Sequence, residues 1–111
     1  MTTPAIKAFH AHVYYHGATK EKAARLYSAV EETFDVLMGH WHDDPIGPHP
    51  MGSYQITFTP GKFGDLVPWL AFNRDGLSIL IHPDTGDDIP DHTDRALWLG
   101  QKLDLDIGAL R

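Results

Sequence analysis

The sequence predicts an α+β sandwich in which two helices cover one face of a four-stranded antiparallel sheet. Hydrophobic residues alternate with the two-residue period of strands and the 3.6-residue period of helices, in the order β-α-β-β-α-β. Glycines and prolines separate these segments. This is the order of a ferredoxin-like sandwich, whose usual strand order is fourth, first, third, second. With 111 residues the chain has the size of one domain, so residues 1–111 are treated as one unit.

The first strand is predicted from Ala8 to His16, where aromatic and β-branched residues alternate. One face of this strand carries His10, His12 and Tyr14. The other face carries Ala11, Val13 and Tyr15. A helix of about 18 residues is predicted after it, with Thr19 as N-cap, because apolar residues recur at three- and four-residue spacing.

The middle of the chain is predicted as a short strand at 40–43, a proline-stiffened loop at 44–52 and a strand at 53–59. A second helix is predicted from Lys62 to Asn73, with Pro68 inside it. Because a proline in a helix interior costs about 3 kcal/mol, we expect this helix to begin late or to kink at Pro68. The last strong strand is predicted from Leu77 to His82.

The tail, residues 83–111, is rich in turn residues and contains one short predicted helix at 94–100.

The helices are expected to cover the face of the first strand that holds Ala11 and Val13, which leaves its histidines on the open face. That open face would also carry apolar side chains from some combination of Tyr14, Tyr54, Ile56, Phe58 and Leu80. Monomers seldom expose so large an apolar patch. We therefore expect a homodimer across the open sheet face, or a tail folded over it. Such a dimer would enclose a cavity lined by histidines.

Composition restricts the partners and the kind of site. The net charge of −6 argues against nucleic acid or an anionic membrane as a partner. No apolar run approaches the roughly 20 residues that span a bilayer, and the first residues lack the apolar core of a signal peptide, so a cytoplasmic location is expected. The chain has no cysteine, which excludes thiolate ligands.

Eight histidines in this short chain suggest a metal site, since imidazole is the commonest metal ligand. His10 and His12 lie on one strand face about 6.6 Å apart, and His82 ends a strand predicted to run beside them. The three imidazoles should therefore converge. His49 joins them only if its loop folds over the sheet or comes from a partner subunit. The alternative is that the histidines are ordinary surface or hydrogen-bonded core residues.

Four segments of the chain resemble the DOPA 4,5-dioxygenase family: residues 9–15, 45–54, 73–83 and 91–100. The resemblance implies an extradiol dioxygenase that uses non-haem iron(II) and molecular oxygen to open a catechol, such as 3,4-dihydroxyphenylalanine, beside its hydroxyls. By position, the histidines that match those of the family are His10, His12, His49, His82 and His92. A purified sample could carry zinc or another divalent ion instead of iron.

Iron(II) sites that activate oxygen commonly use two histidines and one carboxylate. None of the candidate carboxylates here lies in an alternating strand beside a histidine: Asp43, Asp44, Asp84 and Asp91. A three-histidine site, with Asp84 or Asp91 orienting a ring nitrogen, is therefore our first choice. A histidine outside the ligand set would act as the base for the catechol, either His92 or His49. For His92 the alternative is a helix-cap neighbour without chemistry.

Three further residues are candidate substrate ligands, each with a structural alternative. Arg74 could pair with a substrate carboxylate or simply interact with a helix C-terminus. Tyr14 and Tyr54 could donate to a bound phenolate or simply pack. Two other classes of protein also stay open, a binding module with a structural zinc and a structural dimer without metal.

Overall fold

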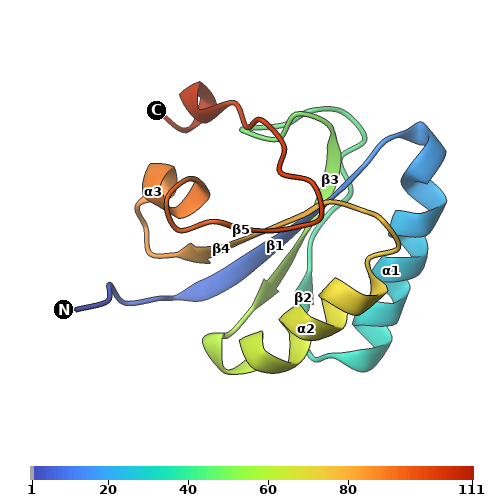
Figure 1. Ribbon diagram of the computed structural model, residues 1–111, viewed down its shortest axis with the longest axis horizontal. Helices are drawn as coiled ribbons and strands as arrows, with labels where there is room; N and C mark the ends of the chain where they lie inside the picture. Colours follow the sequence, from blue (N-terminus) through green and yellow to red (C-terminus); the bar gives the residue numbers. More distant parts are fainter. Residues whose placement is uncertain (1) are drawn as a thin grey trace.

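The computed structural model describes residues 2–111 and shows two main helices on one face of a five-stranded antiparallel sheet, with strand order β2-β3-β1-β4-β5 (Figure 1). The strands are β1 (Ala8–Tyr15), β2 (Leu37–Met38), β3 (Gly52–Phe58), β4 (Ile79–Asp84) and β5 (Leu97–Leu99). The helices are α1 (Lys20–Thr33), α2 (Phe63–Asn73) and α3 (Asp88–His92). Short 3₁₀ turns occupy Gly17–Thr19, Pro60–Lys62 and Ile107–Leu110.

The first four strands have the order predicted for a ferredoxin-like sandwich, and β5 adds a fifth strand beside β4. The predicted helix at 94–100 is wrong. Residues 97–99 pair with β4 instead, because Leu99 packs against the core while Trp98 lies opposite Leu80 on the other face. This two-residue alternation belongs to a strand, and the short helix of the tail lies earlier, at α3.

Three predicted element boundaries also need correction. The short strand lies at Leu37–Met38, and of the predicted segment 40–43 only His42 forms a bridge, to Ser53. Helix α1 has 14 residues because the chain becomes extended at Phe34 before it enters β2. Helix α2 does not begin late: it starts at Phe63 and contains Pro68. Pro68 is exposed, so water can bind the carbonyl that lacks its helical partner.

The hydrophobic core lies between the sheet and the helices α1 and α2. Ala11, Val13 and Tyr15 belong to it, as predicted from the alternation of β1. On β3, Ile56 lies opposite Ala11, Tyr54 opposite Val13 and Phe58 opposite Phe9, so all three belong to the same core face. Of the five residues from which some combination was expected on the open face, these three therefore lie on the core face instead. Of the apolar residues expected there, Tyr14 and Leu80 lie outside the core cluster.

The other face of the sheet is covered by the chain itself. Figure 1 shows α3 and the C-terminal segment on the side of the sheet opposite α1 and α2. The loop between β2 and β3 folds toward the same segment, and the backbone N–H of Asp106 donates to the carbonyl of Pro48 at 2.9 Å. A folded tail therefore covers the open face, while a homodimer stays a prediction. Within residues 2–111, no helix is long and apolar enough to cross a membrane.

Candidate metal centre

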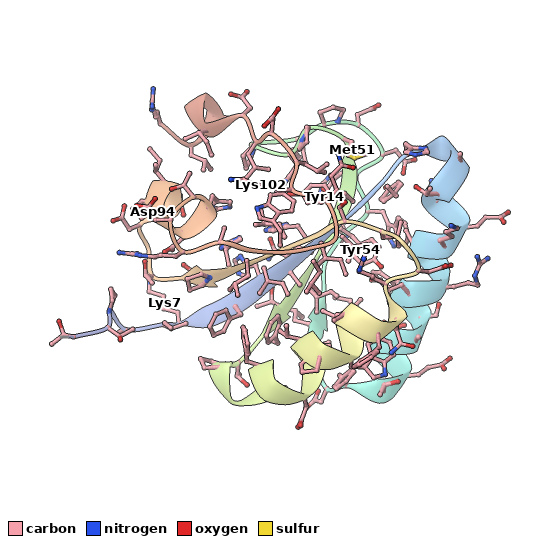
Figure 2. All side chains as sticks on the ribbon, viewed as in Figure 1. Lys7, Tyr14, Met51, Tyr54, Asp94 and Lys102 are labelled. Atoms are coloured by element: carbon pink, nitrogen blue, oxygen red, sulfur yellow. The ribbon has the colours of Figure 1, made fainter. Side chains whose placement is uncertain are left out.

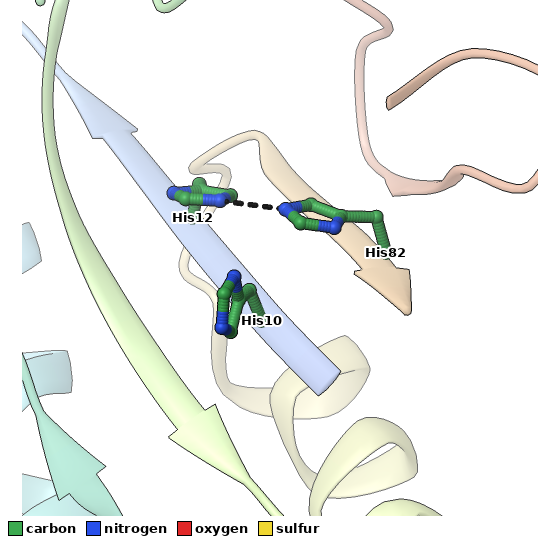
Figure 3. A group of neighbouring side chains, drawn as sticks. All are labelled: His10, His12 and His82. Carbon is green, nitrogen blue, oxygen red and sulfur yellow. Dashed lines mark hydrogen bonds between the residues drawn. The ribbon is translucent and has the colours of Figure 1, made fainter. Parts of the chain in front are cut away.

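Two neighbouring strands place three imidazoles together on the covered face of the sheet. In the pairing of β1 with β4, His10 lies opposite His82 and His12 lies opposite Leu80. Because alternate residues of a strand share a face, the three histidine side chains project to the same side. Each offers one ring nitrogen within 4.8 Å of the other two (Figure 3). His12 and His82 are buried, and His10 is half-buried.

The geometry of this triad fits a divalent ion. The Nε2 atoms of His12 and His82 are 2.9 Å apart. Imidazole nitrogens bound to one ion at 2.0–2.1 Å can lie about 3 Å from each other. Nδ1 of His82 donates to the carbonyl of Pro83 at 2.8 Å, which leaves the lone pair of Nε2 directed into the cluster. In the described part of the chain, the group consists of imidazoles without a carboxylate.

Burial keeps these imidazoles neutral, the form that binds metal. It lowers the pKa of His12 well below its ordinary value, and the neighbouring rings of His49 and His82 lower it further. Burial also lowers the pKa of His82 to about 4, although the hydrogen bond to Pro83 opposes the change. The pKa of His10 is lowered by burial too, against the attraction of Asp84. At neutral pH the three rings therefore need not lose a proton before they bind an ion.

His49 reaches the triad from the loop between β2 and β3. The loop folds over the sheet, the condition under which the sequence predicts that His49 joins the site. Its ring centre is 4.2 Å from that of His12. The Tyr14 hydroxyl and Nδ1 of His49 are 2.7 Å apart and share a hydrogen bond. Burial lowers the pKa of His49 to about 4, with a contribution from His92.

His92 reaches the triad from the other side, at the end of α3. Its ring centre is 4.0 Å from that of His82 and 6.3 Å from that of His12. Nδ1 of His92 donates to the carbonyl of Asp88 at 2.7 Å. Its Nε2 therefore carries a free lone pair that can accept a proton. All five histidines that were matched by resemblance meet in one cluster.

The three candidate substrate ligands have different places. Tyr14 is buried in the cluster, stacked on Trp98 with ring centres 5.9 Å apart, and burial raises its pKa, so the phenol is neutral. Tyr54 lies on the core side of the sheet (Figure 2), where its hydroxyl donates to the carbonyl of Ala23 at 2.8 Å. The Tyr54 hydroxyl is therefore engaged on the core side, although Tyr54 also contributes to the lining of the hollow beside His12 and His49.

Arg74 and the predicted orienting carboxylates are engaged elsewhere. Arg74 donates to the carbonyl of Leu77 at 3.1 Å, within the turn after α2. Asp84 accepts from the backbone N–H of Gly86 at 3.2 Å, and the hydrogen bonds of Asp91 go to Thr85 and Arg95. The expectation that Asp84 or Asp91 orients a ring nitrogen is therefore corrected, since backbone carbonyls hold Nδ1 of both His82 and His92.

Two hollows open beside the cluster. One of about 360 Å³ is lined in part by His12, His49 and Gln55. The other, of about 320 Å³, is lined in part by His92, Trp98 and Lys102. Gln55 was missed by the sequence analysis, although the register places it directly opposite His12. Trp98, which stacks on Tyr14, lines the second hollow from β5, a strand that the sequence analysis did not predict.

Comparison with known proteins places the chain in a family. The family model described as "Dopa 4,5-dioxygenase family" matches residues 9–109. An uncharacterized 21.2 kDa protein of Botryotinia fuckeliana is 37% identical over 94% of this chain and 63% of its own length. A DOPA 4,5-dioxygenase of Amanita muscaria is 35% identical over 95% of this chain and 50% of its own length. The chain thus spans about half to two thirds of the length of these curated relatives.

A crystal structure described as a candidate dioxygenase of Nostoc punctiforme has the same fold. It superposes with a TM-score of 0.94 at 51% sequence identity, covering 96% of this chain and 92% of that one.

Proposed function

The chain belongs to the Dopa 4,5-dioxygenase family, and from this premise we propose that it is an extradiol dioxygenase that opens a catechol, such as 3,4-dihydroxyphenylalanine, at a non-haem iron(II). The observation that carries the proposal is the triad of His10, His12 and His82, whose ring nitrogens lie close enough to hold one ion. Softer thiolate ligands are absent from the sequence, and imidazole suits iron.

In the proposed reaction a catechol and dioxygen combine, and no other reductant is required. The ring carbon–carbon bond beside the two hydroxyls breaks, and both atoms of dioxygen enter the product. Iron(II) held by the triad would supply positions for the two catechol oxygens and for dioxygen, and would activate the oxygen. The residues of the chain then have to bind the ring, accept protons from its hydroxyls and limit the access of water.

His92 is suited to accept a catechol proton. Its Nδ1–H is held by the carbonyl of Asp88, so Nε2 is the nitrogen that can accept a proton, and the centre of the ring lies 4.0 Å from that of His82. His49 has one free nitrogen, Nε2, since its Nδ1 is bonded to Tyr14. That nitrogen can serve as a fourth ligand or as a second partner for a catechol hydroxyl.

The ring of the catechol has a place in the hollow beside His12 and His49. Its volume of about 360 Å³ is in the range of small-ligand pockets. Ile46 and Pro48 give this hollow apolar walls, while Gln55 adds an amide. The folded loop thus brings apolar surface against the ring and His49 against its hydroxyls.

Reconstitution with iron(II) under anaerobic conditions tests the proposal. Catechols are then added in air, and oxygen uptake and the visible spectrum are recorded. We expect oxygen consumption and a coloured ring-opened product, both lost in His12→Ala. His16→Ala is the matched control, since His16 is exposed and outside the cluster. Metal binding without turnover of any catechol would support a binding module instead, and absence of metal binding would support a purely structural protein.

A further inference from the structure

One buried charged group beside the cluster has no part in the proposed chemistry. Asp91 is 1% exposed and sits in α3 directly before His92. Its carboxylate accepts from the backbone N–H of Thr85 at 2.8 Å and from the Thr85 hydroxyl at 2.8 Å. Nη1 of Arg95 also donates to it, at 3.0 Å. The same guanidinium nitrogen donates to the Thr85 hydroxyl at 3.0 Å, so the three side chains form one closed network.

This network joins three separate points of the chain. Thr85 follows directly after β4, Arg95 stands two residues before β5, and Asp91 lies in the helix between them. Burial of a carboxylate costs free energy unless the charge is paired and hydrogen-bonded. Burial by itself raises the pKa of Asp91, but the bonds from Thr85 and Arg95 outweigh it and lower the pKa, so the group is charged.

The network joins Thr85 to Arg95, and His92 lies in the segment between these two residues. Helix α3 has only five residues, which is too short to be stable by its own backbone hydrogen bonds. Something outside the helix must therefore hold it against β4. The Asp91 network does so one residue away from the ring that lies 4.0 Å from the ring of His82.

We propose that Asp91 is a positioning residue that, through Thr85 and Arg95, holds α3 so that the His92 ring faces His82. The catalytic consequence of this role rests on the proposed function, in which His92 accepts the catechol proton. The structural consequence does not, because it concerns only where the His92 ring lies and which of its nitrogens carries the proton.

Nuclear magnetic resonance on the metal-free protein tests the structural part. In the wild type we expect contacts between the ring protons of His82 and His92 and a proton on Nδ1 of His92. Asp91→Asn removes the charge that Arg95 pairs with, and should weaken both the ring-proton contacts and the Nδ1 proton signal of His92. Arg95→Gln removes the same ion pair at its more exposed partner, and it replaces Asp91→Asn in the test if that variant fails to fold. Asp87→Asn, at an exposed carboxylate without a side-chain cap bond, should leave both signals unchanged.

A double-mutant cycle on turnover of the iron-loaded protein tests the catalytic part. Loss of a general base typically lowers kcat by about 100-fold or more. If Asp91 acts through His92, Asp91→Asn lowers kcat with little change in KM, and Asp91→Asn combined with His92→Ala is no slower than His92→Ala alone.

Two results would overturn the proposal. One is a folded Asp91→Asn or Arg95→Gln protein that keeps the contact between the His82 and His92 rings and the Nδ1 proton. The other is an additive loss of kcat in the double variant. If no variant and no wild-type sample turns over a catechol, the proposed function fails, and the resonance measurements still decide the role of Asp91.

Discussion

Backbone carbonyls determine which nitrogen two of the histidines present to the cluster. The carbonyl of Pro83 binds Nδ1 of His82, and the carbonyl of Asp88 binds Nδ1 of His92. Each ring is thereby held in the tautomer whose Nε2 is unprotonated, and in the metal-free protein Nε2 of His82 accepts a hydrogen bond from Nε2 of His12. The convergence of His10, His12 and His82 could be predicted, because the two-residue period and the pairing of β1 with β4 place them on one face. Their carbonyl partners could not, since these depend on local turn geometry.

At the same scale, removal of the Tyr14 hydroxyl tests its link to His49. Tyr14→Phe keeps the ring stacked on Trp98 but deletes the 2.7 Å hydrogen bond to Nδ1 of His49. We expect a loss of about 0.5–1.5 kcal/mol in the free energy of unfolding and a lower kcat/KM for catechols. Urea unfolding and oxygen uptake measure the two effects.

Tyr27→Phe is the matched control for that variant. The Tyr27 ring packs on the core side of the sheet, against Trp41 and Tyr54, and its hydroxyl donates to the carbonyl of Gly39 and not to a histidine, so this variant should lower stability without lowering kcat/KM. Equal turnover in Tyr14→Phe and wild type would show that Tyr14 is only a packing residue.

The depressed histidine pKa values predict acid sensitivity of the metal-free protein. His49 and His82 have a pKa of about 4 when folded, against an ordinary value of 6.5. Well above pH 6.5 these rings are neutral in both the folded and the unfolded state, so their titration does not change the free energy of unfolding there. Between pH 6.5 and about 4 the unfolded state binds more protons, and the free energy of unfolding falls as the pH falls.

Urea unfolding of metal-free protein across this range measures the effect. The loss between pH 7 and pH 5 should be smaller in His82→Gln, which cannot take up the proton. A bound divalent ion should raise stability most at neutral pH, where the ligands are unprotonated in both states. A stability profile that is flat from pH 7 to pH 5 would contradict the burial of neutral histidines.

Two irregular elements, rather than the sheet, complete the cluster. The loop between β2 and β3 brings His49, and α3 brings His92. The alternation of β1 and the spacing of α2 could be read from the sequence because they repeat over many residues. The fold of the loop could not, since it depends on a contact between Pro48 and Asp106, far along the chain. The three-residue strand β5 is too short for its alternation to be distinctive.

The contact between the loop and the tail can be broken by one substitution. Asp106→Pro removes the backbone N–H that donates to Pro48, and the φ of −81° at Asp106 suits proline. We expect the loop to loosen, with faster proteolysis around residues 44–51 and a kcat/KM for catechols lowered about tenfold. Limited proteolysis and oxygen uptake check this, with Asp106→Asn, which keeps the N–H, as the control. Unchanged turnover in Asp106→Pro would show that His49 does not depend on the tail.

At the scale of the whole molecule, the two faces of the sheet have different roles. One face forms the core with α1 and α2, and the other face carries the histidines under the chain's own loop and tail. The fold class could be predicted because element order and periodicity are properties of the entire chain. Coverage of the open face was predicted only as one of two alternatives, since the sequence does not show where a turn-rich tail packs. All five histidines of the cluster come from one copy of the chain.

The central claim is that the clustered histidines hold an ion at which a catechol is opened by dioxygen. The most direct test is to supply the iron-loaded protein with isotope-labelled dioxygen and a catechol, and to measure the mass of the product and the oxygen consumed. The account predicts that oxygen and catechol disappear in equal amounts and that both labelled atoms enter one ring-opened product. An unchanged catechol in the presence of protein that has bound iron at His10, His12 and His82 would contradict it.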